Sequence, residues 1–471
     1  MKKPILLSAL LLAFMFASAQ HGHEHHQHAP QKKKAQPAPS KKAPADTAKK
    51  KASPKKPLID TTHKHQHHMA DHQMTHSYSL GLPMNRNGSG TSWLPDNTPI
   101  YAYMRHGKKG WGYMFHGNIF LRYTMQNFNN SYRRGGQEFD VPNWFMGMGQ
   151  KRVGQNGLFS FTAMLSLDAM TVGEAGYPLL FQSGETWRGQ PLIDRQHPHD
   201  LFTNLSVGYT QRINEDMDAT IYLGYPGEPA LGPPTFMHRI SSISNPDAPL
   251  GHHWQDASHI TFGVGTLGLR YKWLKAEGSI FTGREPDENR YDFERPLMDS
   301  YSYRLSANLS DALSVQVSQG FLHEPEALHP GTDVTRSSAS LAHSVRLNEN
   351  DHLNSALAWG FNDAGHGHEE HSLLAESGLG LGKNLLYARY EFVQKSAEEL
   401  GLEEALGHRA VSNIHAFTLG ASRKLWNAFA TDLWLGAQLT MNAAPGELVP
   451  YYGDMPLSGQ VYLRVSPQLL R

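Results

Sequence analysis

Apolar and polar residues alternate along most of the chain from residue 99 onward. Around residue 205, for example, Leu201, Leu205 and Val207 fall on one face of an extended chain, and Ser206 and Gly208 fall on the other. Strict alternation over eight or more residues is typical of a β-strand with one apolar face. The pattern predicts sixteen strands, near residues 115–126, 142–152, 157–170, 200–212, 217–226, 258–271, 273–284, 301–309, 313–322, 335–347, 352–362, 372–382, 385–395, 411–422, 429–441 and 458–467.

The connections between these strands alternate in length. Short ones, such as residues 154–156 and 383–384, are followed by long ones, such as 171–199 and 227–257. Strands of about ten residues with short turns on one side and long loops on the other are typical of transmembrane β-barrels. The alternative is a soluble all-β propeller or sandwich, but we find no repeating blade motif. The pattern favours an all-β, antiparallel transmembrane barrel over residues 99–471.

The composition limits the kinds of metal site and nucleophile that the chain can form. The 471 residues include no cysteine, which excludes disulfides, thiolate nucleophiles, iron–sulfur clusters and Cys-ligated zinc. Outside the N-terminus, no window approaches the ~18 consecutive apolar residues of a membrane-spanning helix. Any bound metal would depend on His, carboxylate, Met or backbone ligands.

The N-terminal region differs from the rest of the chain in composition. Lys2 and Lys3, an apolar stretch over residues 5–16 and a small-residue site at 17–19 predict a cleaved secretory signal peptide over residues 1–19. Residues 20–98 are rich in His, Lys and Pro, bury little apolar surface, and are expected to form a disordered tether. The barrel region carries more acids than bases, and we expect no nucleic-acid partner.

Two groups of histidines flank the lysine-rich part of this tether. Closely spaced imidazoles on a flexible chain can chelate Cu(II), Ni(II) or Zn(II), and methionine adds a ligand for Cu(I). The alternative is a solubilising or pH-sensitive tail. The predicted metal-binding residues of the tether are His21, His23, His25, His26, His28, His63, His65, His67, His68, His72 and His76.

Topology predicts the orientation of the barrel. An even number of strands places both ends of the barrel on the same side as the short turns, which we expect to face the periplasm of a diderm bacterium. The long loops then face the outside. Outer-membrane lipid is the expected surrounding, and periplasmic metal-efflux or metal-binding components are candidate partners.

Two of the long loops carry candidate chemistry. Pro198 favours an extended conformation at the preceding residue, so His197 and His199 can project to one side. A nearby carboxylate is the usual partner that fixes the tautomer of a ligating imidazole. We expect the two loops to meet over the lumen in a metal site or a structural plug formed by Asp194, His197, His199, Asp200, His252, His253, Asp256 and His259. The His-rich stretch at residues 365–371 is a third candidate, or a solvated loop.

The strings DRQHPHD (residues 194–200) and PLGHHWQD (residues 249–256) resemble a group of bacterial outer-membrane β-barrel proteins without an assigned reaction. The resemblance covers the chain from about residue 100 and implies an outer-membrane location and a heavy-metal or copper-resistance context. The last strand lacks the terminal aromatic residue common in such barrels, which is a departure from the pattern.

The sequence leaves three functions open. The first is a channel or porin-like protein linked to heavy-metal handling, because sixteen strands leave an aqueous lumen. The second is a barrel that binds a metal or partner without conducting. The third is a lipid hydrolase that uses Ser258 beside His259, but no G-x-S-x-G motif supports it. We therefore expect that the chain is not an enzyme and that it has no obligatory cofactor.

Overall fold

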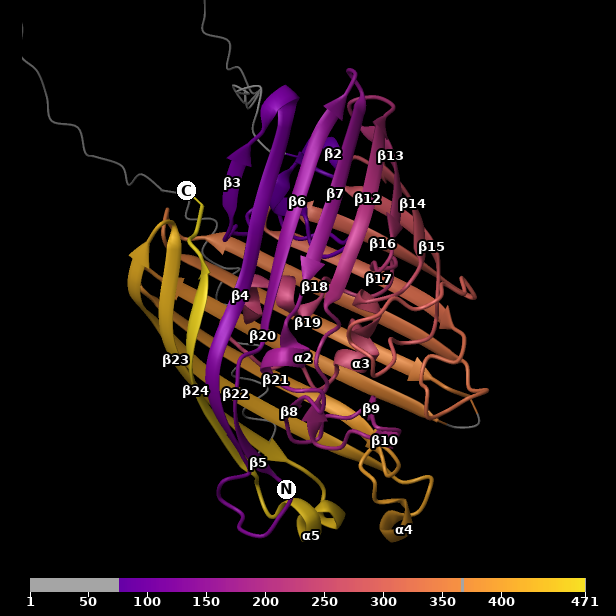
Figure 1. The fold of residues 1–471 in the computed structure, drawn as a ribbon, viewed down its shortest axis with the longest axis vertical. Helices are drawn as coiled ribbons and strands as arrows, with labels where there is room; N and C mark the ends of the chain where they lie inside the picture. The colour runs from indigo at the N-terminus through magenta and orange to yellow at the C-terminus, as the bar shows by residue number, and fades with distance from the viewer. Residues whose placement is uncertain (1–75, 366–367, 471) are drawn as a thin grey trace, which may run out of the picture. The chain divides into compact units, whose positions relative to one another are not determined.

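The computed structural model describes residues 76–365 and 368–470, which form a closed antiparallel β-barrel (Figure 1). Sixteen long strands make the wall, and the last of them closes the ring against the first. The prediction of an all-β barrel of sixteen strands is confirmed. The strands are β4 (Trp111–Gln126), β6 (Asn143–Val153), β7 (Gly157–Leu165), β12 (Phe202–Arg212), β13 (Met217–Gly224), β14 (Val264–Tyr271), β15 (Leu274–Phe281), β16 (Ser300–Ser310), β17 (Leu313–Leu322), β18 (Val334–Arg346), β19 (His352–Asp363), β20 (Glu369–Leu381), β21 (Asn384–Ser396), β22 (Val411–Ala428), β23 (Thr431–Ala443) and β24 (Leu457–Pro467).

Two short strands complete the closure around β4. On one side β4 pairs first with β3 (Tyr103–His106) and then with β24, and on the other it pairs with β6 and then with β5 (Gly136–Asp140). Strand β4 therefore serves as the partner of four strands, and the seam between β24 and β4 is the pairing that closes the barrel.

The connections alternate in length as the sequence predicts. Turns such as residues 154–156 and 272–273 gather at one end, which we call the short-turn end, and connections such as residues 166–201 gather at the long-loop end (Figure 1). Strand β24 finishes at the short-turn end, because Pro467 pairs with Thr431 beside the turn that precedes β23. No helix in residues 76–365 or 368–470 is long and apolar enough to cross a membrane.

The barrel is apolar outside and polar inside. Leu223, Leu267 and Leu439 are among the large side chains exposed on the outer face, whereas inward-facing Arg304 and Arg389 are almost completely buried. This is the reverse of a soluble protein, and it follows from the period-two alternation along each strand.

A long connection between β13 and β14 occupies the lumen. We call residues 225–263 the lumen loop, and nearly all of them are buried. Its Asp247 accepts a hydrogen bond from Arg122 of β4 at 2.6 Å, and its Arg239 donates to Glu376 of β20 at 2.8 Å. Gly232 makes the path possible: it has φ +81°, and a Cβ there would lie 2.2 Å from the Gln255 carbonyl oxygen.

Residues 77–102 also fill the barrel interior, at the short-turn end. The segment includes β2 (Ser79–Pro83), and Ser79 donates a hydrogen bond to Asp218 of β13 at 2.5 Å. Tyr101 hydrogen-bonds His352 of β19 at 2.8 Å. The expectation that the tether is disordered up to residue 98 therefore does not hold for residues 76–98, whose polar side chains find partners on the wall. The predicted signal peptide and the tether up to residue 75 lie outside the described residues.

Two predicted strands extend five or six residues beyond the observed ones. Residues 166–170 leave the sheet as the chain enters α2 (Asp168–Thr171), and residues 258–263 precede β14 and begin in η5 (Ala257–His259). In the second case Thr261 donates its hydroxyl hydrogen to the Ser258 carbonyl oxygen. Such local side-chain hydrogen bonds compete with the sheet ladder, and alternation alone does not reveal them.

Candidate functional site: a buried histidine cluster

Two connections at the long-loop end bring five imidazoles together inside the barrel. The first two histidines lie between β11 (Arg195–Gln196) and β12, and the other three lie in α3 (His252–Gln255) and η5. Their ring centroids are 5.1 to 6.4 Å from those of their neighbours. We call this group the histidine cluster: His197, His199, His252, His253 and His259.

Three of the rings are oriented by an oxygen atom that lies within 3.0 Å of Nδ1. His199 Nδ1 lies 2.7 Å from a carboxylate oxygen of Asp168, and His252 Nδ1 lies 2.5 Å from a carboxylate oxygen of Asp256. His259 Nδ1 lies 3.0 Å from the Asp256 backbone oxygen. Because these oxygens only accept hydrogen bonds, Nδ1 is the donor, and a neutral ring keeps its lone pair at Nε2. The Nε2 atoms of His199 and His259 are buried without a hydrogen-bond partner in the described structure.

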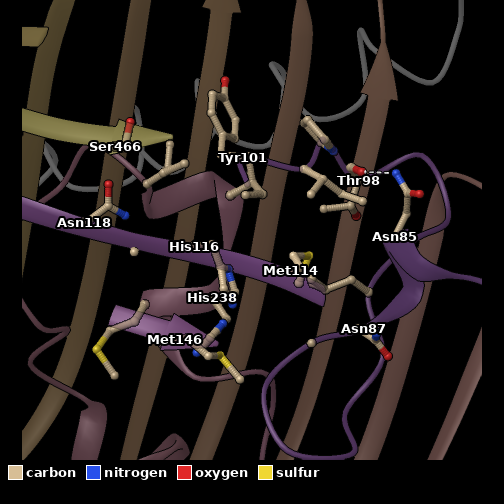
Figure 2. Close-up of a pocket in the computed structure, with 18 of the residues that line it drawn as sticks. Asn85, Asn87, Thr98, Tyr101, Met114, His116, Asn118, Met146, His238 and Ser466 are labelled. Carbon is tan, nitrogen blue, oxygen red and sulfur yellow. Dashed lines mark hydrogen bonds between the residues drawn. The ribbon is translucent and has the colours of Figure 1, made fainter. Parts of the chain in front are cut away.

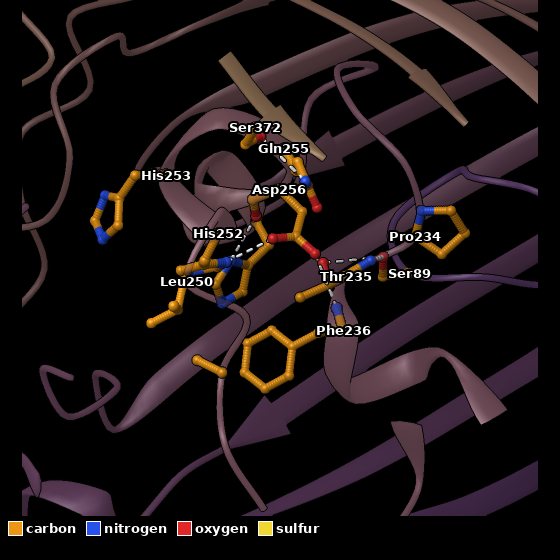
Figure 3. A network of polar contacts seen from close by, with 12 residues as sticks. Ser89, Pro234, Thr235, Phe236, Leu250, His252, His253, Gln255, Asp256 and Ser372 are labelled. Atoms are coloured by element: carbon orange, nitrogen blue, oxygen red, sulfur yellow. Dashed lines mark hydrogen bonds and ion pairs between the residues drawn. The ribbon is translucent and has the colours of Figure 1, made fainter. Parts of the chain in front are cut away.

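Asp256 is the anchor of this arrangement (Figure 3). Its other carboxylate oxygen accepts hydrogen bonds from Arg239 at 2.9 Å and from the Phe236 N–H at 3.0 Å. Burial opposes its charge, but His252 and Arg239 hold the pKa of Asp256 below its usual value. Asp256 therefore stays ionised, and His252 is fixed in one tautomer.

A second set of charges borders the cluster on the side of the long-loop end. His197 Nε2 lies 3.0 Å from a carboxylate oxygen of Glu185, which is paired with Arg290. Arg290 also approaches Asp200, at 3.8 Å. Burial raises the pKa of Asp200 to about 7, so its carboxyl gains and loses a proton near neutral pH.

Most of the imidazoles are held neutral. Burial lowers the pKa of His252, and it lowers the pKa values of His197 and His259 well below the usual range. His253 behaves differently: burial opposes its charge, but Glu285 at 3.5 Å raises its pKa. Neutral imidazole is the form that binds a metal ion, so the fold provides ligand-competent rings.

All five rings line one small cavity of about 10 Å³. That volume is close to the space that a single water needs, which is roughly 10–15 Å³. Glu185 and Glu285 also line a much larger vestibule of about 670 Å³ at the long-loop end. The vestibule is rich in acids: Glu185, Glu285, Asp287, Glu288, Glu326, Glu398, Glu399 and Glu403.

The structure brings together most of the loop residues that the sequence singled out. All five histidines and Asp200 line the cavity, and Asp256 bonds His252. Asp194 is the exception, because its carboxylate accepts hydrogen bonds from the Phe181 N–H and the Tyr452 hydroxyl away from the cavity.

Four other residues of the site were missed by sequence reasoning. Asp168 lies in a predicted strand, and the others lie in loops with no motif around them, so only their position in space connects them to the histidines. They are Asp168, Glu185, Glu285 and Arg290.

The remaining candidates lie elsewhere. His76 begins β1 (His76–Ser77), and the other tether histidines lie outside the described residues. Of residues 365–371, His371 belongs to β20 and stacks on Phe361 with 4.6 Å between ring centroids. Ser258, the candidate nucleophile of the hydrolase alternative, is buried beside His259.

The five rings lie close together but do not converge on one point. In the part of the chain that the structure describes, no group of three or more His, Asp or Glu side chains stands at metal-binding geometry. An ion in the cavity would therefore need the imidazoles to shift toward it.

No protein-family model and no curated protein sequence matches this chain. Similar solved structures include Salmonella typhi OmpF in complex with daunomycin, which is 8% identical with a TM-score of 0.47 over 77% of this chain and 100% of that one. An anion-selective porin from Comamonas acidovorans is 12% identical with a TM-score of 0.44 over 76% and 99% of the two chains. Pseudomonas aeruginosa OpdQ is 10% identical with a TM-score of 0.38 over 75% and 97%. Similarity at this level carries no information on the activity of this chain.

Proposed function

We propose that this chain is an integral β-barrel of the bacterial outer membrane that binds transition-metal ions inside its lumen. The apolar outer face and the closed ring of strands support the membrane location. Within lipid, only a closed barrel or a helix satisfies its backbone hydrogen bonds. Exposed aromatic residues support it too: Tyr271 and Trp273 lie at the short-turn end, and Tyr301 and Tyr303 lie in the half of β16 toward the long-loop end.

The filled lumen favours binding over open conduction. Buried ion pairs join the lumen loop to two separate parts of the wall, through Arg122 and Asp247 and through Arg239 and Glu376. Breaking a buried pair by removing one partner costs about 3–5 kcal/mol, so the lumen loop is not expected to leave the barrel readily. Of the functions that the sequence left open, a non-conducting metal-binding barrel fits better than a porin-like channel.

One observation carries the metal proposal. His199, His252 and His259 border a single-atom cavity, and each has its Nδ1 fixed by an oxygen atom. A carboxylate or carbonyl behind a ligating imidazole is the usual outer support of a protein metal site. Imidazole suits Zn(II), Ni(II) and Cu(II), and the acidic vestibule would attract such cations to the neighbouring cavity.

The test is stabilisation by metal of the purified full-length protein in detergent. Zn(II) at 100 times its Kd should stabilise the folded barrel by about 2.7 kcal/mol, seen as a rise of several degrees in the unfolding temperature. We expect His259→Ala to abolish most of this rise.

The matched control is His323→Ala, because His323 is an exposed imidazole that is hydrogen-bonded to Asp333 at 2.7 Å and does not line the cavity. Equal stabilisation of His259→Ala and the wild type would place the ion elsewhere, for instance on the predicted ligands of residues 21–76, and would overturn the proposal. Steady conductance of the wild type in planar bilayers would contradict the closed lumen.

The same proposal gives the tether a role. Residues 21–76 would bind Cu(II), Ni(II) or Zn(II) on the periplasmic side, where a metal-binding or efflux component would be the partner. Titration calorimetry with the corresponding peptide tests this part separately, and no binding at micromolar ion would leave a spacer.

A further inference from the structure

A second cavity, of about 80 Å³, lies near the short-turn end, and methionines line it together with neutral polar and apolar side chains (Figure 2). Its methionines come from four elements: η1 (Met84–Arg86), β4, β6 and η3 (Phe236–His238). We call it the thioether pocket, after Met84, Met114, Met146, Met148 and Met237.

Two imidazoles share this pocket with the thioethers. His116 of β4 and His238 of η3 have ring centroids 5.5 Å apart, and Figure 2 shows them beside Met114 and Met146. The Nε2 atom of His116 is buried without a hydrogen-bond partner in the described structure. Trp144 packs against both rings, with centroid distances of 5.2 and 5.0 Å.

The pocket has no charge of its own. Of the described residues that line it, none is Asp, Glu, Lys or Arg, and burial lowers the pKa of His238 to about 4. A divalent ion without a carboxylate would pay a large desolvation penalty here. A monovalent ion with soft ligands costs less, and thioethers together with imidazoles select Cu(I) over harder ions.

We propose that the thioether pocket is a binding site for a soft monovalent cation of the Cu(I) class, with ligands drawn from His116, His238 and the surrounding methionines. This site goes beyond the proposed function, since it differs from the histidine cluster in position, ligands and ion. Methionine is also a common filler of irregular cores. Flexible side chains that only filled space would close the void, yet about 80 Å³ remains open beside an unpartnered imidazole nitrogen.

Silver(I) is the probe, because it is soft and monovalent and is not oxidised in air. Purified full-length protein in detergent, in nitrate buffer free of halide and thiol, is titrated with Ag(I), and bound silver is measured after desalting. We expect the double variant Met146→Leu/Met148→Leu to lose one equivalent of tightly held Ag(I), with affinity at that site reduced on the order of tenfold or more.

The matched control is Met125→Leu/Met170→Leu, which changes two exposed methionines and should retain that equivalent. Silver retained at wild-type affinity by Met146→Leu/Met148→Leu would overturn the proposal. So would displacement of this silver by a tenfold excess of Zn(II), because the site would then not be soft.

Two further measurements keep the test decisive. If the double variant fails to fold, wild-type protein labelled at its methionine methyl groups should show NMR shifts of Met146 and Met148 on addition of the first equivalents, and unshifted signals would contradict the site. His259→Ala should leave Ag(I) binding intact, and Met146→Leu/Met148→Leu should leave stabilisation by Zn(II) intact. The two proposals can therefore fail independently.

Discussion

The histidine cluster and the thioether pocket place the same ligand, a buried neutral imidazole, in opposite surroundings. In the cluster the rings are backed by carboxylates and stand next to an acidic vestibule, and Arg239 and Arg290 balance the charge. In the thioether pocket the rings lie among methionine, aromatic and neutral polar side chains, without a charged lining residue among those described. Under the two proposals, the neighbours of the imidazole, more than the imidazole itself, decide which ion each site accepts.

The largest expected effect comes from removing a buried charge beside the histidine cluster, because the described lining of the thioether pocket has no such charge. Arg239→Met would leave Asp256 and Glu376 without a shared buried cation, and we expect a loss of about 3–5 kcal/mol in the free energy of unfolding. Urea unfolding in detergent measures it. The control Arg423→Met removes an exposed arginine that contacts Asn384 and should change stability by less than ~0.5 kcal/mol. Similar losses in both variants would mean that the buried network does not brace the cluster.

The second effect is a dependence on pH. The pKa values of His252 and His259 are lowered in the folded protein, whereas an unfolded histidine titrates near 6.5. The neutral rings therefore contribute stability above about pH 6.5 that is lost as the pH falls and the unfolded state takes up protons. We expect metal-free His259→Gln to lose less stability than the wild type between pH 7.5 and 5.5.

Comparison with His259→Gln is needed because Asp200, whose pKa is raised to about 7, works in the opposite direction. A raised carboxyl pKa favours the folded state at low pH. If the variant and the wild type lose stability equally over this range, the histidine is not held neutral by the fold.

A smaller effect should distinguish the two sites by how strongly ion binding at each depends on a nearby negative charge. Glu285 lines both the vestibule and the cavity, and Glu285→Gln removes a charge without changing shape. We expect Zn(II) affinity to fall about tenfold, equivalent to about 1.4 kcal/mol, with Ag(I) affinity unchanged. Calorimetry at low and high salt measures it, and an equal fall for both ions would indicate a general loss of structure.

The smallest effect is on packing. Met148→Leu conserves volume in the thioether pocket, so we expect a change of less than ~1.5 kcal/mol in the free energy of unfolding. Urea unfolding measures this, and stabilisation by Zn(II) should remain as in the wild type. A larger loss would indicate that the thioether contributes more than volume to the folded state.

The wall of the barrel could be predicted from the sequence, because each strand repeats a two-residue pattern for eight or more residues. The contents of the lumen could not. The lumen loop is held by polar side chains such as Arg239, Ser241 and Asp247, which bond an already polar wall, and such burial leaves no apolar periodicity. Residues 258–263 even imitate a strand, although Ser258 and Thr261 bond to each other in a turn.

The two candidate sites also differ in how much of each could be predicted from the sequence. The two His-containing strings pointed to the cluster, but Asp168 reaches it from α2, 31 residues before His199, and Glu285 reaches it from the connection between β15 and β16. The thioether pocket could not be predicted from the sequence, because Met146 and Met148 look like the apolar face of one strand. Only the folded arrangement brings η1 and η3 against them.

The contacts of Asp247 bear on how the closing seam of the barrel is held together. This one carboxylate binds Arg122 of β4 and Gln460 of β24, the two strands that meet at the closing seam. Arg464 of β24 also donates to the Ile243 carbonyl oxygen of the lumen loop, at 2.8 Å. The lumen loop is therefore a non-covalent cross-link across the closing seam, which is held by these side-chain contacts as well as by its own backbone hydrogen bonds.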